Sequence, residues 1–481
     1  MNYGIVIKVL GNLLLFKAAS LLLPLAVALN DNGPDTRAFV VSIILTVVAA
    51  LLMRQLPKED GALRVREALL IVVLGWFLVS SFGALPFILS GSIPSVVDAF
   101  FESVSGLTTT GATIIDDIEV LPSGVLFWRS FLHWLGGMGI LVLALAILPM
   151  AGVGGFHIFR AESPGPISDK LVPKLKDTAK ILYTAYLGLT ALQVILLLFG
   201  GMTFYDSLIH TFGTVGTGGF STYNDSIGAF DSAYIRMIIS IFMVAAGVNF
   251  ALYYALYQGN WRRAFRSDEL RLYLGIVAVS TVLITLSMQG QFYDSLWQSF
   301  QHAFFQASSF ITTTGYTTAD YEQWPALAQT VLFFLMFVGG SAGSTAGGIK
   351  VIRWLVAGKI IRHEMRKILH PRAYSSLHVN GRPIAAETIN SVVAFLFLYG
   401  LIFLGGSLLV AMFEGTTILS AASSAAATLG NIGPGFGIVG PGETYSHFSH
   451  ASKLVLAMLM LLGRLELFTF FLLFTPSFWR Q

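Results

Sequence analysis

The feature of the sequence that most constrains its fold is a short pattern that occurs four times. Each copy has an apolar residue, three small or polar residues and a glycine, and the glycines follow one another at intervals of 108, 96 and 118 residues. A catalytic site does not repeat four times in one chain, whereas four equivalent backbone segments around one axis can line a pore for an ion. We therefore predict that these loops form one ion-selectivity filter, made of Thr108, Thr109, Thr110, Gly111, Val215, Gly216, Thr217, Gly218, Gly219, Thr312, Thr313, Thr314, Gly315, Gly430, Asn431, Ile432 and Gly433.

Composition places this pattern in a membrane protein. Of 481 residues, 55% are apolar and only 11% are charged, and the mean hydropathy is +0.73. Such a chain is typical of a polytopic helical membrane protein and not of a soluble enzyme. The net charge of only +3 suggests no nucleic-acid partner, and the absence of cysteine excludes disulfides and thiolate metal sites. The apolar run 10–29 is too long for a cleaved signal peptide, so we interpret it as a spanning helix.

The order of apolar segments predicts an all-α fold with an N-terminal hairpin and four tandem units. In each unit a spanning helix, a shorter apolar segment ending in a filter loop and a second spanning helix follow one another. The hairpin helices are expected at 10–29 and 38–53. The first helices are expected at 67–90, 178–201, 270–288 and 388–413. The short segments are expected at 97–107, 204–215, 296–311 and 417–429, and the second helices at 125–150, 233–258, 326–357 and 452–475.

These segments predict ten spanning helices arranged with pseudo-fourfold symmetry around one ion pore. The hairpin would occupy residues 1–60 and the units 61–150, 151–260, 261–370 and 371–481. The repeat extends beyond the glycines, since the sequence 99–103 (AFFES) falls on 303–307 (AFFQA) when the filter glycines are aligned. In the second loop either Gly218 or Gly219 could be the filter glycine. We prefer Gly219, because the other register would place Thr214 in an otherwise apolar column.

Basic residues predict the orientation of the chain. With the N-terminus in the cytoplasm, the inner connections carry most of the lysines and arginines, which is the usual bias. They are Arg54, Lys58, Arg64, Arg66, Arg160, Lys170, Lys174, Lys176, Lys180, Arg262, Arg263, Arg266, Arg271, Lys359, Arg362, Arg366, Lys367 and Arg372. The opposite side is richer in acids, among them Asp116, Asp117, Glu119, Asp320 and Glu322. The filter loops would therefore face outward, where negative charge attracts cations.

The composition of the four loops favours a monovalent cation. Segments of 11–16 residues cannot cross the membrane and must turn back, and irregular backbone at that depth is tolerated only where it is buried or lines a watery cavity. Glycine allows the backbone to present successive carbonyls, and threonine hydroxyls can add ligands or tie the loop to its helix. None of the four loops contains an acidic residue, although a carboxylate ring is expected for a divalent ion.

A second interruption, in the last helix of unit three, predicts a gate. Residues 339–348 read GGSAGSTAGG, and so many glycines and small hydroxyls should break a helix below the filter. The same pattern could instead form a close helix-packing seam. Two charges within apolar sequence are also candidates, since such residues are functional by default. The gating candidates are Gly339, Gly340, Gly343, Gly347, Gly348, Lys350 and Arg464.

These motifs resemble those of one transporter superfamily over essentially the whole chain. The TTTG stretches 108–111 and 312–315, the GGF at 218–220 and the NIGP at 431–434 are similar to the filter loops of the Trk, Ktr and plant HKT potassium transporters. The extra N-terminal hairpin favours the TrkH family of Trk membrane subunits. The resemblance implies low-affinity-type K⁺ uptake across the bacterial inner membrane, with an intramembrane loop at 339–348 that obstructs the path. It also implies that Arg464 faces the pore below the filter.

The resemblance further implies partners, and the residues leave some alternatives open. A TrkH homodimer and a ring of TrkA, a cytoplasmic nucleotide-binding subunit, are expected, with docking surfaces at 151–177 and 358–387 that could equally be held by anionic lipid. Besides a passive K⁺ pore, uptake could be coupled to Na⁺ or H⁺, although Glu466 is the only carboxylate that we identify in a span near the filter. Arg464 could have a structural role instead, bonding the exposed carbonyls of a filter or gate loop.

Some other motifs suggest different chemistry. Gly339 to Gly343 satisfies the G-x-S-x-G pattern of serine hydrolases around Ser341, but we expect no enzyme, because no strand-to-helix elbow or evident base accompanies it. Asn249 could contact water or ion, or bond between helices. Histidines 133, 210 and 302 lack metal-ligand spacing, so we interpret them as buried imidazoles with satisfied hydrogen bonds.

Overall fold

The computed structural model describes residues 1–55, 64–139, 175–370 and 376–480, and almost all of its regular structure is helical. Within these residues the strands are two pairs of residues, β1 (His378–Val379) and β2 (Arg382–Pro383), which form a small antiparallel hairpin. The predicted helical membrane fold is therefore confirmed. The predicted docking loop 151–177 and the end of the first unit's second helix lie largely outside the described residues.

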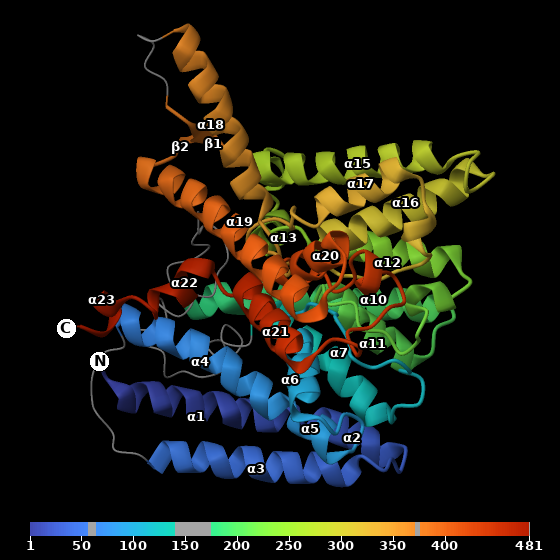
Figure 1. The fold of residues 1–481 in the computed structure, drawn as a ribbon, viewed down its shortest axis with the longest axis vertical. Coiled ribbons are helices and arrows are strands. Elements are labelled where there is room, and N and C mark those ends of the chain that lie inside the picture. Colours follow the sequence, from blue (N-terminus) through green and yellow to red (C-terminus); the bar gives the residue numbers. More distant parts are fainter. Residues whose placement is uncertain (56–63, 140–174, 371–375, 481) are drawn as a thin grey trace.

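The N-terminal hairpin is formed by three helical segments. Helices α1 (Tyr3–Ser20) and α2 (Leu22–Asn30) together make one span, and α3 (Thr36–Gln55) returns beside α1 (Figure 1). The side chain of Asn2 begins α1 by accepting a hydrogen bond of 3.0 Å from the Ile5 amide, which is an ordinary N-terminal cap. The hairpin predicted from hydropathy is confirmed.

The four predicted first helices are also present. They are α4 (Val65–Gly83), which a break before Pro86 separates from α5 (Leu85–Leu89), then α10 (Leu175–Phe199), α15 (Asp268–Met288) and α19 (Ala386–Glu414). With the two hairpin spans they make six helices that are long and apolar enough to cross a membrane, among the described residues. The proline explains the break in α4, because it has no amide proton to donate to the preceding turn.

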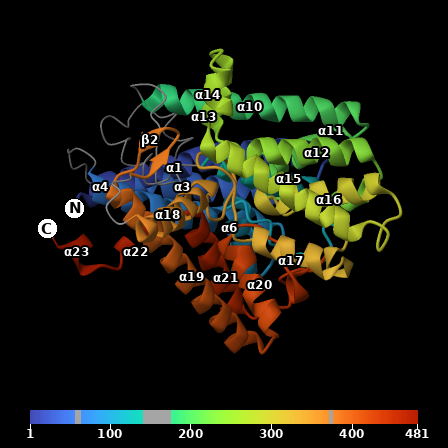
Figure 2. The same cartoon turned by 90° about the horizontal axis from the view of Figure 1, so that it is seen from above.

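Four shorter helices end at the four filter loops. They are α6 (Val96–Leu107), α11 (Phe204–Val215), α16 (Leu296–Ile311) and α20 (Ile418–Leu429), within one residue of the predicted ranges. Each is preceded by serine or threonine, and the side chains of Ser95, Thr203 and Thr417 accept the capping hydrogen bond. Seen from above, α6 lies in the interior of the molecule, between α10 and α19 at opposite edges (Figure 2).

The predicted interruption of the second helix in unit three is present, but the second helices of the other units, which we predicted as single spans, are also broken or shorter than predicted. In unit two, α12 (Ala233–Ala246) and α13 (Phe250–Tyr257) meet at an angle of 93°. In unit three, the chain between α17 (Ala326–Leu335) and α18 (Val351–Leu369) is not helical. In unit four, α21 (His450–Arg464) ends before α22 (Leu467–Leu472). In unit one, α7 (Ser123–Gly137) ends before the undescribed residues.

Glycines at the helix breaks account for this difference. Gly136 and Gly463 lie just before the ends of α7 and α21, and Gly247 and Gly339 lie within breaks. The atoms nearest to a Cβ at Gly136, Gly339 and Gly463 include backbone atoms of another segment, whereas those at Gly247 are the side chains of Tyr273 and Thr312. A side chain at Gly136 would collide with the carbonyl of Leu107, and one at Gly463 with the carbonyl of Leu429. Hydropathy does not detect such contacts. If the bent pair α12 and α13 is counted as one span, the described residues contain seven spans instead of six.

The remaining helices are short and lie in the connections. They are η1 (Ser226–Ala229), α14 (Trp261–Phe265), η2 (Tyr321–Gln323), η3 (Gly437–Val439) and α23 (Pro476–Trp479). Both chain ends lie at the same edge of the molecule (Figure 1), where the Arg66 guanidinium donates a hydrogen bond of 2.6 Å to the Arg480 carbonyl. This edge collects the first residues of α1 and α4 and the end of α3.

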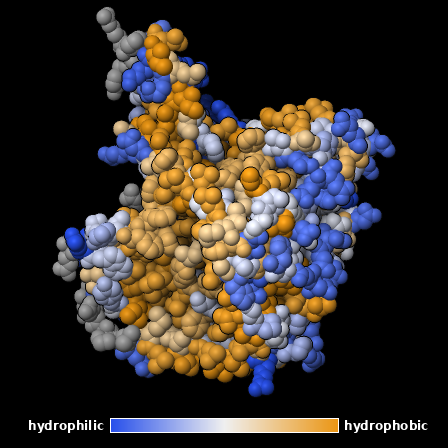
Figure 3. Space-filling view, viewed as in Figure 1, coloured by the Kyte–Doolittle hydropathy of each residue, from blue (hydrophilic) through white to orange (hydrophobic). Residues whose placement is uncertain are grey.

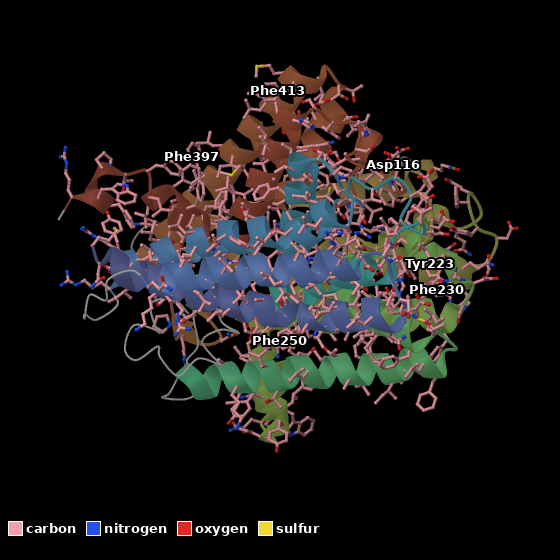
Figure 4. The ribbon with its side chains drawn as sticks, turned by 90° about the horizontal axis from the view of Figure 1, so that it is seen from below. Asp116, Tyr223, Phe230, Phe250, Phe397 and Phe413 are labelled. Carbon is pink, nitrogen blue, oxygen red and sulfur yellow. The ribbon has the colours of Figure 1, made fainter. Side chains whose placement is uncertain are left out.

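The surface has the character expected for a protein embedded in lipid. A broad apolar area covers the face in Figure 3, and hydrophilic residues gather toward one side of it. Phe397 and Phe413 of α19 lie at the periphery in Figure 4, with exposed fractions of 70% and 42%. A continuous exposed apolar surface of this kind is suited to a membrane.

Candidate functional site

The four filter loops share one backbone conformation at the ends of their short helices. The second residue after each helix has a positive φ, at Thr109 (57°), Thr217 (57°), Thr313 (56°) and Asn431 (55°). In the first loop the Thr110 amide donates to the Ser105 carbonyl at 2.9 Å, and the same bond recurs in the other three at 2.7 to 2.9 Å. This is a Schellman ending, normally made by glycine, and here it is made by residues with side chains.

The four filter glycines form a closed ring of contacts. Gly111, Gly219, Gly315 and Gly433 have φ angles of 81°, 79°, 81° and 93°, which favour glycine. A side chain at Gly111 would collide with the Gly218 carbonyl, one at Gly219 with the Thr314 carbonyl and one at Gly315 with the Ile432 carbonyl. One at Gly433 would meet the Thr110 carbonyl, so the order of contacts runs from unit one to four and back to one.

The second loop has the register that places Gly219 among these glycines. Gly219 has the positive φ and the carbonyl contact, whereas Gly218 lies at the place of Thr110. The threonine hydroxyls of loops one and three brace the backbone. Thr108 and Thr110 lie 2.8 Å apart through their hydroxyls, and the Thr108 hydroxyl also donates to the Val104 carbonyl at 2.7 Å. The hydroxyls of these two residues therefore tie the loop to its supporting helix.

A buried ion pair that we did not predict supports the first two loops. The Arg129 guanidinium of α7 lies 2.8 Å from the Glu102 carboxylate of α6, and both side chains are 0–1% exposed. The same carboxylate accepts bonds from the Thr113 hydroxyl and the Ile114 amide, just beyond Gly111. Arg129 also lies over the ring of Phe220, at 4.2 Å from its centroid. Glu102 follows two phenylalanines in an apolar segment, so its sequence context did not indicate a buried ion pair.

A depression opens at the four glycines, and we expect it to face outward from the distribution of basic residues. Gly111, Gly219, Gly315 and Gly433 all line it, together with acidic Asp116 and Glu443. Asp116 and Tyr223, another residue of the lining, lie at the same end of the molecule in Figure 4. The Thr444 hydroxyl donates a hydrogen bond to Asp116 and holds the pKa of that carboxyl below its ordinary value. The carboxylate is therefore ionised at neutral pH and favours cations here.

The glycine-rich segment 336–350 forms a loop that contacts the filter from the other side. The Gly347 amide donates to the Thr313 hydroxyl at 2.6 Å, and a side chain at Gly347 would meet Asn431 and the Gly430 carbonyl. The Ser341 amide donates to the Gly247 carbonyl at 2.9 Å. This loop, which we call the gate loop, therefore lies against the third and fourth filter loops and against the break between α12 and α13.

One acidic residue joins the middle of this loop to the start of α18. The Glu269 carboxylate accepts a hydrogen bond of 2.7 Å from the Ala342 amide and one of 3.2 Å from the Ile352 amide. Glu269 is 7% exposed and lies in the first turn of α15, after the capping residue Ser267. An acidic residue in the first turn of a helix is common, so the sequence did not indicate that Glu269 bonds the gate loop. The inference that Glu466 was the only carboxylate near the filter is corrected by Glu269 and Glu102.

Arg464 connects the gate loop to the first filter loop. Its guanidinium donates to the carbonyls of Thr345, Gly136 and Gly137 at 2.6 to 2.7 Å and lies 3.2 Å from the Thr109 hydroxyl. Arg464 is the last residue of α21 and does not lie in the middle of a helix as predicted. The helix dipole favours a positive charge at this C-terminal end. The structural contacts that we considered for Arg464 are therefore present.

The other charges of the gate region line an inner cavity with Arg464. Its lining includes Gly343, Gly347, Gly348, Lys350, Arg353, Arg464 and Glu466. Lys350 precedes α18 and donates to the Ala346 carbonyl, and it is only 3% exposed. Arg353 pairs with Glu466 at 2.6 Å, which joins α18 to the break after α21. The gate loop, α18 and α21 thus share one charged cavity.

The remaining candidates have structural partners. The Asn249 side chain accepts from the Ala251 amide and caps α13, so it ends the break instead of bonding between helices. His133 and His210 are fully buried, and both nitrogens of each ring are hydrogen-bonded, as expected. The hydroxyl of Ser341 has no hydrogen-bond partner within the described part of the chain, so no base activates it there.

Comparisons with known proteins agree with this arrangement. The TrkH family, described as cation transport protein, matches residues 35–481. The Trk system potassium uptake protein TrkH of Salmonella typhimurium is 40% identical over 486 residues, which cover 100% of both chains. TrkG of Escherichia coli, also a Trk system potassium uptake protein, is 35% identical and 99% of each chain is covered.

A solved structure gives the same result for the fold. The crystal structure of the potassium transporter TrkH from Vibrio parahaemolyticus superimposes with a TM-score of 0.89 at 36% identity and covers 100% of both chains. The matching family and the relatives named above are transport proteins, so the G-x-S-x-G pattern does not indicate an enzyme. The chain therefore belongs to the TrkH family of cation transport proteins.

Proposed function

We propose that this chain takes up K⁺ as the membrane subunit of a Trk system, through a gated, channel-like filter in the bacterial inner membrane. The observation that carries the proposal is the closed ring of four glycines with matching φ angles, each against the carbonyl of the next loop. Four uncharged loops that approach so closely offer backbone oxygens around one point. Such oxygens can replace the hydration shell of a monovalent cation without holding it as tightly as carboxylates would.

The filter residues of this proposal are those named from the sequence, 108–111, 215–219, 312–315 and 430–433. The short helices α6, α11, α16 and α20 end there, so the negative ends of their dipoles favour a cation at the loops. The division into a hairpin and four pore units is part of the same proposal. K⁺ is the transported ion, and the relatives named potassium uptake proteins support this choice over other cations.

The gate loop would close the path below the filter. Its support is the set of contacts from Gly347 to Thr313 and from Arg464 to Thr345, which join it to the filter loops. Opening would require these bonds to break while the filter stays in place. The cytoplasmic position of the N-terminus follows from the distribution of basic residues, and a homodimer and a TrkA-like regulatory subunit follow from the family.

Potassium flux into liposomes that hold only the purified protein tests the proposal. The K⁺, Na⁺ and proton gradients are set independently. Flux that follows the K⁺ gradient alone is expected for the proposed pore. Flux that requires a Na⁺ or proton gradient would make the protein a coupled transporter. No flux in the protein alone, followed by flux once the cytoplasmic subunit is added, would locate control of the gate in that partner.

The filter itself is tested by substituting its glycines. Gly111→Ser or Gly315→Ser introduces a Cβ that meets the carbonyl of the neighbouring loop, at a φ that disfavours side chains. We expect a lower preference for K⁺ over Na⁺ in competition uptake. Gly290→Ser is the control, because Gly290 also has a positive φ but has no atom near its missing Cβ. Unchanged selectivity in both filter variants would contradict the four-loop filter.

A further inference from the structure

The second helices of the four units contain equivalent buried positions behind the filter. His133, Met243 and Met460 lie in the last turns of α7, α12 and α21, and Met336 directly follows the last residue of α17. All four side chains are 0% exposed. Their contacts also correspond, because a side chain at Gly216 would meet the His133 carbonyl and one at Gly430 the Met336 carbonyl. Unit one therefore differs from the others by having histidine where they have methionine.

The second filter loop, which lies beside His133, also differs from the other three at one position. The residue before the filter glycine is Thr110, Thr314 or Ile432 in three loops, but it is Gly218 in the second. A Cβ at Gly218 would collide with Cγ, Nδ1 and Cδ2 of the His133 ring. Gly218 does not have a positive φ, so its backbone does not demand glycine. The imidazole thus fills the space that a side chain occupies in the other loops.

His133 also bonds the helix before the first filter loop and the residue after the second. Its Nδ1 lies 2.8 Å from the Gly106 carbonyl, which also accepts from the Thr109 amide of loop one. Its Nε2 accepts a bond of 3.2 Å from the Phe220 amide, next to Gly219 of loop two. Because one partner is an acceptor and the other a donor, a single neutral tautomer, protonated on Nδ1, satisfies both. The ring also lies 4.2 Å from the Phe220 ring, between centroids.

We propose that His133 is a positioning residue for ion selectivity: with Gly218 it forms a matched pair that sets the shape of the second filter loop. This inference rests on the filter proposed above. The loop has glycine at both positions where loop one has the bracing Thr108 and Thr110 hydroxyls, namely Gly216 and Gly218. It therefore lacks a brace of its own, and the imidazole supplies one from α7.

Substitution of His133 tests this role by selectivity and not by uptake alone. In His133→Ala the space behind Gly218 empties and the Phe220 amide loses its acceptor. The loss of one hydrogen bond typically changes an equilibrium constant about fivefold. We therefore expect the K⁺ to Na⁺ permeability ratio to fall about fivefold. His302→Ala is the matched control, because that imidazole bonds the Thr318 hydroxyl and does not contact Gly218. It should leave the ratio unchanged.

Rescue by the pair found in other units separates positioning from general stability. Gly218→Thr alone should lower the ratio, because the new side chain collides with the ring. His133→Met with Gly218→Thr gives the second loop the threonine of loops one and three, and gives α7 the methionine that the other units have at the position of His133. This double variant should recover most of the ratio. Thermal unfolding in detergent accompanies each variant. If stability falls while the ratio is unchanged in folded His133→Ala, the residue is only structural and the inference is overturned.

Gly315→Ser, measured in the same assay, distinguishes the two proposals. If it lowers the ratio and the His133 variants do not, the filter stands and the role of His133 is wrong. If neither lowers the ratio, both the filter and the positioning role are overturned. If the double variant is no better than Gly218→Thr alone, the two residues do not act as a pair, which also contradicts the inference.

Discussion

At the scale of single residues, the filter depends on side chains held in an unusual backbone conformation. Thr109, Thr217, Thr313 and Asn431 lie in the left-handed region, which costs residues with a Cβ about 1–2 kcal/mol each. Their side chains explain why glycine is not used. Asn431 donates to the Thr110 hydroxyl and the Met460 carbonyl, and Thr313 accepts from Gly347. These residues therefore connect the filter loops to the gate loop and to a second helix by hydrogen bonds.

Removing Arg464 is predicted to raise basal cation flux. A fixed positive charge beside the path repels a cation, and each ~1.4 kcal/mol of repulsion that is removed raises the rate about tenfold, so Arg464→Ala should raise flux by about that factor or more. The lost bonds to Thr345, Gly136 and Gly137 also free the gate loop. Liposome flux measures the effect, with Arg362→Ala of exposed α18 as control for loss of a positive charge. Equal flux in the two variants would argue against a role for Arg464 in closure.

The Glu102 and Arg129 pair is predicted to be important for stability. Removal of one partner leaves a charge that is 0–1% exposed, which typically costs about 3–5 kcal/mol. Arg129→Met alone or Glu102→Gln alone should therefore lower the unfolding temperature strongly. The double substitution Glu102→Gln with Arg129→Met should lower it less, because no buried charge remains. Thermal unfolding in detergent tests this, and a double variant as unstable as the sum of the singles would refute it.

At the scale of elements, the first helices and the second helices behave differently. The first helices form continuous spans because their apolar length is sufficient by itself, as at α15 and α19. The second helices begin as predicted but break where they pass the filter loops, after Ala246, Leu335 and Arg464. In units two and four hydropathy is continuous across the break, so the sequence suggested one helix, whereas in unit three the glycines of 339–348 indicated the break. Contact with another backbone decides the break.

Glu269 is predicted to keep the gate loop closed. Its side chain accepts hydrogen bonds from both the Ala342 and Ile352 amides, and each hydrogen bond contributes about 0.5–1.5 kcal/mol. Glu269→Ala should therefore raise basal flux by about tenfold or more while the K⁺ to Na⁺ ratio is retained. The neighbouring Asp268→Ala is a matched control, since that carboxylate bonds Lys359 and Asn380 instead of the gate loop. Unchanged flux in Glu269→Ala would show that this anchor does not hold the gate.

At the scale of the whole molecule, the four units close into a ring because each filter glycine meets the next unit. The last contact, from Gly433 to Thr110, joins residues more than 300 positions apart. Such closure requires all four units, so we expect them to fold as one structure around the filter. The N-terminal hairpin packs outside the ring, with α1 against α3 and α4.

The orientation of the whole molecule can be measured in a chain without cysteine. Single cysteines at exposed Tyr3 and Arg362 should react with an impermeant maleimide only after cells are permeabilised. Cysteines at exposed Asp117 and Glu443, near the depression at the four glycines, should react in intact cells. Wild-type protein is the unlabelled control. Labelling of the Tyr3→Cys variant in intact cells would reverse the proposed orientation.

The sequence by itself determined the membrane class, six spans and four short helices, because these depend on local length and hydropathy. The limits of α6, α11, α16 and α20 were predicted to within one residue. The four-loop pattern was visible because the left-handed corners and glycines impose the same local chemistry four times. The glycines and small residues of 339–348 likewise indicated an interruption, since they are poor helix formers.

Only the tertiary structure decided the order of the ring, the breaks of the second helices in units two and four, and the residues that support the filter. Arg129 meets Glu102, Glu269 meets the gate loop, and His133 fills the place beside Gly218. The members of these pairs are between 27 and 85 positions apart in the chain. Local sequence cannot show such partners, because the close approach that selects glycine or a buried charge exists only when the segments are packed together.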